Sequence, residues 1–156
     1  MKRFGFWQKW LLVSGLVFVL MGLAFVAISL LGVDLGYINA AFWGTEEIPV
    51  EVKPFQTWIY GVYSAMALAF GLCIIFLASN AFKKREKWSW SCLAIGFLTW
   101  FAFDTLFSIR AGVYTNAFNN TLLFVLLVLP LLFTRKAFVL RKDPAQGRSE
   151  ARGQVI

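Results

Sequence analysis

Four apolar runs, each about twenty residues long, constrain this chain more than any other feature of its sequence. They lie at residues 10–31, 57–79, 88–109 and 117–134. A helix needs about 20 mostly apolar residues to cross the hydrocarbon core of a bilayer, and lipid leaves no partner for unpaired backbone groups. Each run is therefore predicted to be a transmembrane α-helix. We expect an all-α fold, a four-helix transmembrane bundle formed by residues 1–140.

Composition supports the membrane assignment and narrows the chemistry. Hydrophobic residues make up 60% of the chain and charged residues only 15%, against about 25% charged residues in soluble domains. The sequence holds no histidine, which excludes His-based nucleophile systems and makes most zinc sites unattainable. It also shows no complete set of catalytic residues. We expect a non-enzymatic protein with no catalytic residue, no metal and no cofactor.

The positive charges predict the orientation of the spans. The chain has 15 Lys and Arg residues and a net charge of +7, and all but Lys53 and Arg110 flank the same side of the predicted spans. By the positive-inside rule, both termini are expected in the cytoplasm of a bacterial cell, with the bundle in the inner membrane. Cations that flank membrane helices attract lipid headgroups, so we expect membrane lipids and not nucleic acid as partners. Residues 141–156 have nothing to bury and are predicted to be a disordered cytoplasmic tail.

The connections predict the topology. The links between the second, third and fourth spans are short, which favours antiparallel neighbours in an up-down-up-down bundle. The outer loop, residues 32–56, is longer. Its residues 36–44 are apolar enough for a short interfacial helix, and residues 48–54 alternate like an extended segment whose prolines oppose helix. This loop either caps the outer end of the bundle or extends freely into water.

Small residues on the first two spans predict where helices approach closely. In lipid, helices associate through small residues that let their backbones meet. The first span repeats small residues every seven positions, and the second repeats them every four; we expect a packed interface formed by Gly15, Gly22 and Ser29 with Gly61, Ala65, Ala69 and Cys73.

The most informative side chain is Asp104, the only acid inside a span. An ionised side chain in the membrane costs at least about 2.5 to 3.5 kcal/mol and is by default a functional hypothesis. Its sequence position places it near the outer boundary, where polar and aromatic residues of other spans reach the same depth. Two interpretations remain open. The first is a ligand pocket open to the outer leaflet, formed by Asp104, Tyr60, Tyr63, Trp100, Ser108, Arg110 and Asn120. The second is a structural clasp in which Asp104 pairs with Arg110 or accepts hydrogen bonds from Tyr60 or Tyr63.

Several segments in the second half of the chain carry a family resemblance. They are Trp88-Ser89-Trp90, the stretch 100–108, Tyr114-Thr115-Asn116-Ala117 and the stretch 130–135. Together they resemble a group of small uncharacterised bacterial four-span membrane proteins, and this resemblance implies no reaction, ligand or cofactor. In architecture alone the chain is similar to the sterol-isomerase and sigma-2-receptor superfamily, whose members use intramembrane carboxylates beside aromatic residues. This chain offers one such carboxylate, so paired acid-base work is in doubt.

Three functions remain open on the sequence. The first is an accessory or structural subunit of a membrane complex, with other membrane subunits or further copies of this chain as partners. The second is a binder of a lipid, an isoprenoid or another amphipathic ligand, including a cationic one, at Asp104. The third is a small proton-coupled exporter or membrane isomerase in which Asp104 changes protonation.

Overall fold

The computed structural model describes residues 2–33 and 35–139, so the predicted tail at 141–156 lies outside the described residues. Its helices follow the order α1 (Lys2–Leu31), α2 (Gly36–Trp43), η1 (Val50–Val52), α3 (Lys53–Ser79), α4 (Lys87–Arg110) and α5 (Tyr114–Val139). Over this part of the chain the fold is all helical, which confirms the predicted class.

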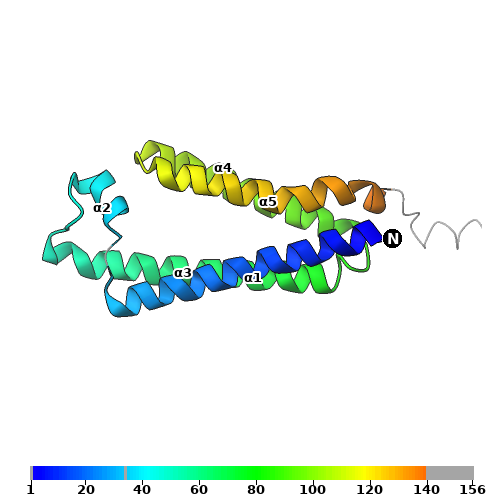
Figure 1. Ribbon diagram of the computed structural model, residues 1–156, viewed down its shortest axis with the longest axis horizontal. Coiled ribbons are helices and arrows are strands. Elements are labelled where there is room, and N and C mark those ends of the chain that lie inside the picture. Colours follow the sequence, from blue (N-terminus) through cyan, green and yellow to red (C-terminus); the bar gives the residue numbers. More distant parts are fainter. Residues whose placement is uncertain (1, 34, 140–156) are drawn as a thin grey trace, which may run out of the picture.

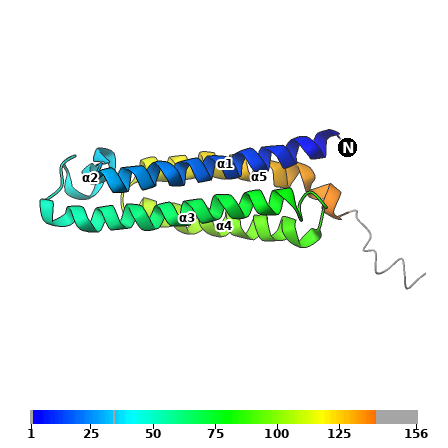
Figure 2. The same ribbon diagram turned by 90° about the horizontal axis from the view of Figure 1, so that it is seen from below.

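The four long helices form an up-down-up-down bundle (Figures 1 and 2). Each of α1, α3, α4 and α5 is long and apolar enough to cross a membrane. The helices pack mainly as two antiparallel pairs, α1 with α3 and α4 with α5, and α1 also contacts α5. We call the end with the N-terminus and the α3–α4 turn the basic end, and the end with α2 the loop end.

The outer loop folds differently from the sequence prediction. Instead of an extended segment at 48–54, a 3₁₀ turn (η1) leads directly into α3, which begins at Lys53. Pro54 lies in the first turn of α3, where its missing N–H removes no helical hydrogen bond and its fixed φ suits the helix. The predicted short helix at 36–44 is present as α2.

Backbone contact between α1 and α3 depends on glycines. A Cβ on Gly71 would lie 2.7 Å from the carbonyl oxygen of Gly15, and one on Gly15 would lie 3.0 Å from that of Gly71. At Gly22 a Cβ would lie 2.9 Å from the backbone nitrogen of Leu68. These distances leave no room for a side chain, so the two helices approach through their backbones.

The face of α3 that packs differs from the predicted one. Ala65 and Ala69, predicted in the interface, are exposed, as is Cys73. The buried positions alternate in steps of four and three: Tyr60, Ser64, Ala67, Gly71, Ile74 and Ala78. This is the seven-residue repeat of a left-handed helix pair, and it matches the seven-residue repeat of Gly15, Gly22 and Ser29 on α1. Gly61, at the edge of this face, lies opposite the Ser29 hydroxyl.

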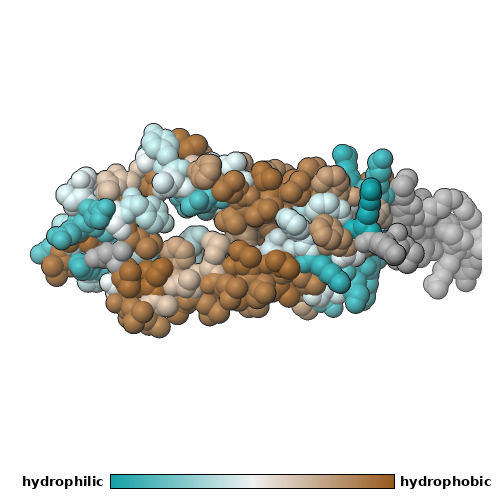
Figure 3. Space-filling view, viewed as in Figure 1, coloured by the Kyte–Doolittle hydropathy of each residue, from teal (hydrophilic) through white to brown (hydrophobic). Residues whose placement is uncertain are grey.

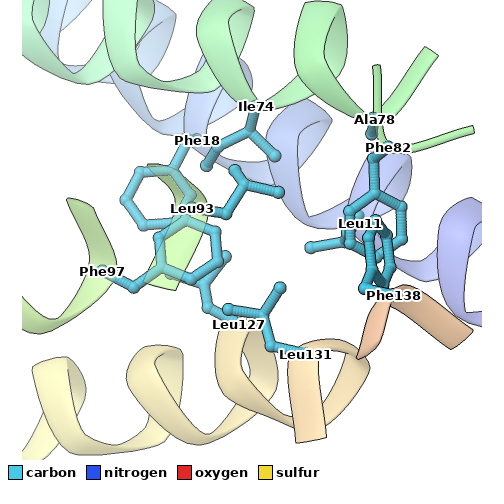
Figure 4. Packing of buried hydrophobic residues seen from close by; sticks show 10 residues of the cluster. All are labelled: Leu11, Phe18, Ile74, Ala78, Phe82, Leu93, Phe97, Leu127, Leu131 and Phe138. Carbon is cyan, nitrogen blue, oxygen red and sulfur yellow. The ribbon is translucent and has the colours of Figure 1, made fainter. Parts of the chain in front are cut away.

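The apolar core lies in the half of the bundle nearer the basic end. Figure 4 shows how its side chains pack. Side chains from all four long helices and from the α3–α4 turn meet there: Leu11, Phe18, Ile74, Ala78, Phe82, Leu93, Phe97, Leu127, Leu131 and Phe138. At its outermost layer the ring of Phe4 stacks on Phe82, with centroids 5.6 Å apart, and Phe82 packs against Phe138 at 4.8 Å. All four spans are therefore joined at this end.

A proline helps to fasten α1 to α5 within this core. Pro130 lies inside α5 and has no N–H to donate to the carbonyl of Leu126, four residues earlier. The indole N–H of Trp10 donates to that carbonyl at 2.9 Å. Trp10 thus satisfies the acceptor that Pro130 releases, and the hydrogen bond crosses between the two helix pairs.

Candidate functional site

Three aromatic rings mark the boundary of the shared core toward the loop end. The ring of Phe18 on α1 lies 5.2 Å from Phe70 on α3 and 5.7 Å from Trp100 on α4, and Phe70 lies 6.2 Å from Trp100. This aromatic layer is where side chains of the α1–α3 pair still meet those of α4.

Beyond the aromatic layer the two helix pairs separate. In Figure 1, α4 and α5 diverge from α1 and α3 toward the loop end, and Figure 3 shows an opening between the pairs, with polar residues on its rim. We call this opening the gap. The predicted neighbours α3 and α4 are joined by a turn but do not stay in contact along their length, because the gap lies between them.

Asp104 lies at this level and is held within the α4–α5 pair. Its Oδ2 accepts a hydrogen bond from the Trp100 indole N–H at 3.1 Å, and its Oδ1 accepts one from the Asn116 amide at 3.0 Å. The Ser108 hydroxyl lies 3.3 Å from the same Oδ1 and donates to the Asp104 backbone oxygen at 2.6 Å. Asn116 also donates to Ser108 at 2.7 Å. The carboxyl group therefore has neutral donors as its hydrogen-bond partners.

The spacing on α4 directs this cluster toward the gap. Trp100, Asp104 and Ser108 are four residues apart and share one face of the helix. Because the Trp100 ring packs against Phe18 and Phe70 of the other pair, the same face carries Asp104 toward α1 and α3. Asp104 also lies within electrostatic range of Tyr63 on α3. The carboxyl group is thus on one wall of the gap.

Asn120 adds a buried donor to the same wall. It lies one turn after Asn116 and one heptad before the core residue Leu127, so it faces the bundle interior. Its side chain is only 4% exposed, and among the residues that the structure describes its Nδ2 has no hydrogen-bond partner. A buried amide without a partner is costly.

The opposite wall is aromatic. The ring of Phe25 on α1 lies 4.9 Å from Tyr63 and 6.2 Å from Tyr60, both edge to face. Tyr63 is partly exposed, at 37%, whereas Tyr60 is buried. The Ser64 hydroxyl donates to the backbone oxygen of Tyr60 and so faces its own helix. This wall offers ring faces and edges opposite the carboxyl group.

The structure brings together part of the predicted pocket. Trp100 and Ser108 each form hydrogen bonds with Asp104, and Asn120 lies one turn after Asn116 on α5. Arg110 is exposed at the end of α4 and is not among the donors to Asp104, so the predicted Asp104–Arg110 clasp is replaced by neutral donors. Asn116 was not among the predicted site residues. The short turn at 111–113 could have indicated Asn116. Residues at equal distances before and after a short turn between antiparallel helices face each other, which places Asn116 opposite Ser108.

The outer loop is attached to the start of α3. Asn39 of α2 is fully buried, and its amide donates to the Glu46 backbone oxygen at 2.8 Å, while Gln56 of α3 donates to the Asn39 oxygen. Between α2 and α3 lies an apolar cavity of about 280 Å³, lined by Ile38, Phe42, Trp43, Val52, Phe55, Gln56, Ile59 and Tyr60. The loop is therefore held against the start of α3 and does not extend freely into water, and the shared Tyr60 places the cavity beside the gap.

The described residues hold no group of three or more His, Cys, Asp or Glu side chains that could bind a metal ion. A scan of protein-family models, a search of curated proteins and a search of solved structures each found no match to this chain.

Proposed function

We propose that this chain is an integral membrane protein that binds an amphipathic molecule with a cationic or hydrogen-bond-donating headgroup in the gap. The observation that carries the proposal is the position of the Asp104 carboxyl group on an open wall, with neutral partners. A carboxylate held only by neutral donors keeps its charge uncompensated and attracts a cation strongly where water is scarce. The headgroup therefore belongs beside Asp104.

The surroundings support the chemical class. Tyr63 and Trp100 offer ring faces that attract a cation, and Asn120 offers a donor to a polar headgroup atom. The apolar cavity next to Tyr60 approaches the lower end of ligand-pocket volumes, about 300 Å³, and suits part of a hydrocarbon chain. A lipid or isoprenoid-like molecule fits this combination of one charged wall and one aromatic wall.

An accessory-subunit function receives less support. A subunit of this kind would need an apolar face that is distinct from the lipid-facing surface, but large exposed apolar side chains occur on all four long helices. Lipid covers such surfaces equally well, so they do not distinguish a protein partner. The gap is the feature that lipid contact alone does not explain.

The proposal includes an orientation. The basic end faces the cytoplasm of a bacterial cell and the gap opens toward the outer leaflet, as supported by the placement of all but two of the 15 Lys and Arg residues. Cysteine labelling tests this. Cys73 and Cys92 are exposed free thiols and can be replaced by serine before a single Glu46→Cys change. A membrane-impermeant maleimide should label Cys at 46 on intact cells; labelling only after permeabilisation would reverse the orientation.

Photocrosslinking tests the ligand class. The protein in nanodiscs is exposed to octadecyl probes of equal length that carry a diazirine and an amine, alcohol or carboxylate headgroup. We expect the amine to label most strongly and the carboxylate least, with adducts in the segments around Tyr63 and Trp100. Equal labelling by all three probes, or adducts spread over the lipid-facing surface, would rule the site out.

Two variants and a matched control sharpen this test. Asp104→Asn should remove the preference for the amine probe but keep an acceptor for Trp100 and Asn116. Asn120→Leu should weaken labelling by the alcohol, whose oxygen can accept a hydrogen bond from Nδ2, whereas Asn119→Leu, at the exposed neighbouring position, should not. An unchanged amine preference in Asp104→Asn, or equal effects at 119 and 120, would contradict the proposed site.

A further inference from the structure

A second recess lies at the basic end, far from the gap. Three positively charged side chains from three different segments line it: Arg3 of α1, Arg85 of the α3–α4 turn and Lys136 of α5. Its volume is about 300 Å³, and its other walls are Phe4, Trp7, Phe133, Thr134 and Ala137. We call it the basic recess.

Arg85 is held in place by its backbone and by an aromatic ring. It has φ of +58°, the one positive φ among the described non-glycine residues, and this left-handed conformation costs about 1 to 2 kcal/mol. Its backbone N–H donates to the Phe82 oxygen at 2.9 Å, and its guanidinium lies 4.5 Å from the centre of the Phe4 ring. Strain of this kind persists at functional positions when the surroundings fix it.

The recess combines charge with an apolar wall. Trp7 and Phe133 stack face to face, with centroids 4.7 Å apart and planes 8° from parallel. The neighbouring carboxylate of Glu86 accepts a hydrogen bond from the Trp88 indole at 2.6 Å and is thereby engaged outside the recess wall. A group that enters the recess therefore meets three cations and a pair of stacked aromatic rings.

We propose that the basic recess binds the phosphate of an anionic phospholipid. Guanidinium groups match phosphate oxygens through paired hydrogen bonds, and basic pockets between membrane helices are typical sites for phosphate-bearing headgroups. The aromatic wall suits the glycerol and upper acyl chain of a lipid and distinguishes this source from free phosphate.

Lipid retention measured by native mass spectrometry tests this site. The full-length protein is equilibrated in nanodiscs with equal parts of phosphatidylglycerol and phosphatidylcholine, released into mild detergent, and analysed for bound lipid. The recess variant carries Arg3→Gln, Arg85→Gly and Lys136→Gln, where glycine preserves the left-handed turn. The control carries Lys9→Gln, Lys83→Gln and Arg135→Gln, three exposed cations outside the recess lining.

The wild type should retain phosphatidylglycerol in preference to phosphatidylcholine. The recess variant should lose this preference by about a hundredfold, because each of the three cations that line the recess contributes about a factor of five when it faces the bound phosphate. The control should change by less than about fivefold, because its cations do not line the recess and no anionic membrane surface remains in mild detergent. Equal losses in the two triple variants would show diffuse attraction only and overturn the site. Displacement of phosphatidylglycerol by millimolar inorganic phosphate would assign the recess to free phosphate and overturn the lipid assignment.

Discussion

At the basic end, the α1–α3 and α4–α5 pairs share one core, whereas at the loop end they face each other across the gap. The difference follows from the residues on the inward faces of the same helices. Toward the basic end, α4 presents Leu93 and Phe97 to the other pair, and toward the loop end it presents Asp104 and Ser108. Apolar side chains pack against each other across the bundle, whereas polar side chains in lipid form hydrogen bonds with the nearest available partner. The partners of Asp104 lie on α4 itself and on α5. These hydrogen bonds therefore stabilise the α4–α5 pair without joining it to the α1–α3 pair.

The largest effect should come from the glycine contact between α1 and α3. Gly71→Ala places a methyl group 2.7 Å from a backbone oxygen, and overpacking of this kind costs about 1 to 3 kcal/mol. The free energy of unfolding, measured by SDS titration in mixed micelles with circular dichroism, should fall by that amount.

The matched control for Gly71 is Gly96 of α4. A Cβ on Gly96 would meet nothing within 4 Å, and alanine favours helix over glycine. Gly96→Ala should therefore leave the free energy of unfolding unchanged or raise it. A loss as large as that of Gly71→Ala would mean that the close approach of α1 and α3 is not the cause.

The next effect should be confined to the loop end. Asn116→Leu removes the amide that donates to both Asp104 and Ser108. Interhelical hydrogen bonds in membranes contribute about 1 to 2 kcal/mol by peptide measurements, and we expect a loss of that size. Backbone hydrogen exchange should increase at the loop end of both helices, in α4 after Trp100 and in the first turns of α5. It should remain unchanged near Leu131, at the basic end of α5. Asn119→Leu is the control, and exchange that increases equally at both ends would contradict the division into two halves.

The sequence predicted the features that follow from length and apolarity. The four spans, their alternation and the short helix α2 depend on runs of apolar residues, which local composition reveals. The sequence prediction chose the wrong packing face of α3, because this helix carries two stripes of small residues. The seven-residue repeat on α1 should have selected the stripe that contains Gly71. Asp104 was evident as a site residue because a charged side chain is costly in lipid. Its hydrogen-bond partner on α5 was not, because that partner depends on the register of α4 and α5 across the 111–113 turn.

The sequence pointed to a pocket near Asp104, but the separation of the two helix pairs that forms the gap was not predictable in the same way. Periodicity identifies which face of a helix points inward, but it does not give the separation between neighbouring helices. That separation depends on the aromatic layer of Phe18, Phe70 and Trp100, whose residues come from three different helices. Likewise, Pro130 indicates that the carbonyl four residues earlier lacks its helical hydrogen bond. The sequence does not reveal that Trp10, more than a hundred residues away, donates to that carbonyl.

The smallest effect tests whether this hydrogen bond helps to close the basic-end half. Trp10→Phe removes the donor to Leu126, and we expect a loss of about 0.6 kcal/mol, the average for interhelical hydrogen bonds in a membrane protein. Pro130→Ala restores a backbone N–H to the same carbonyl. In the Pro130→Ala background the cost of Trp10→Phe should therefore shrink, and a double-mutant cycle should report the coupling. Trp90→Phe is the control, because the indole of Trp90 donates to the Leu131 oxygen at 2.9 Å and the N–H of Arg135, four residues on, remains available there. Without coupling at Trp10, the joining of α1 to α5 would have to be assigned to the apolar core alone.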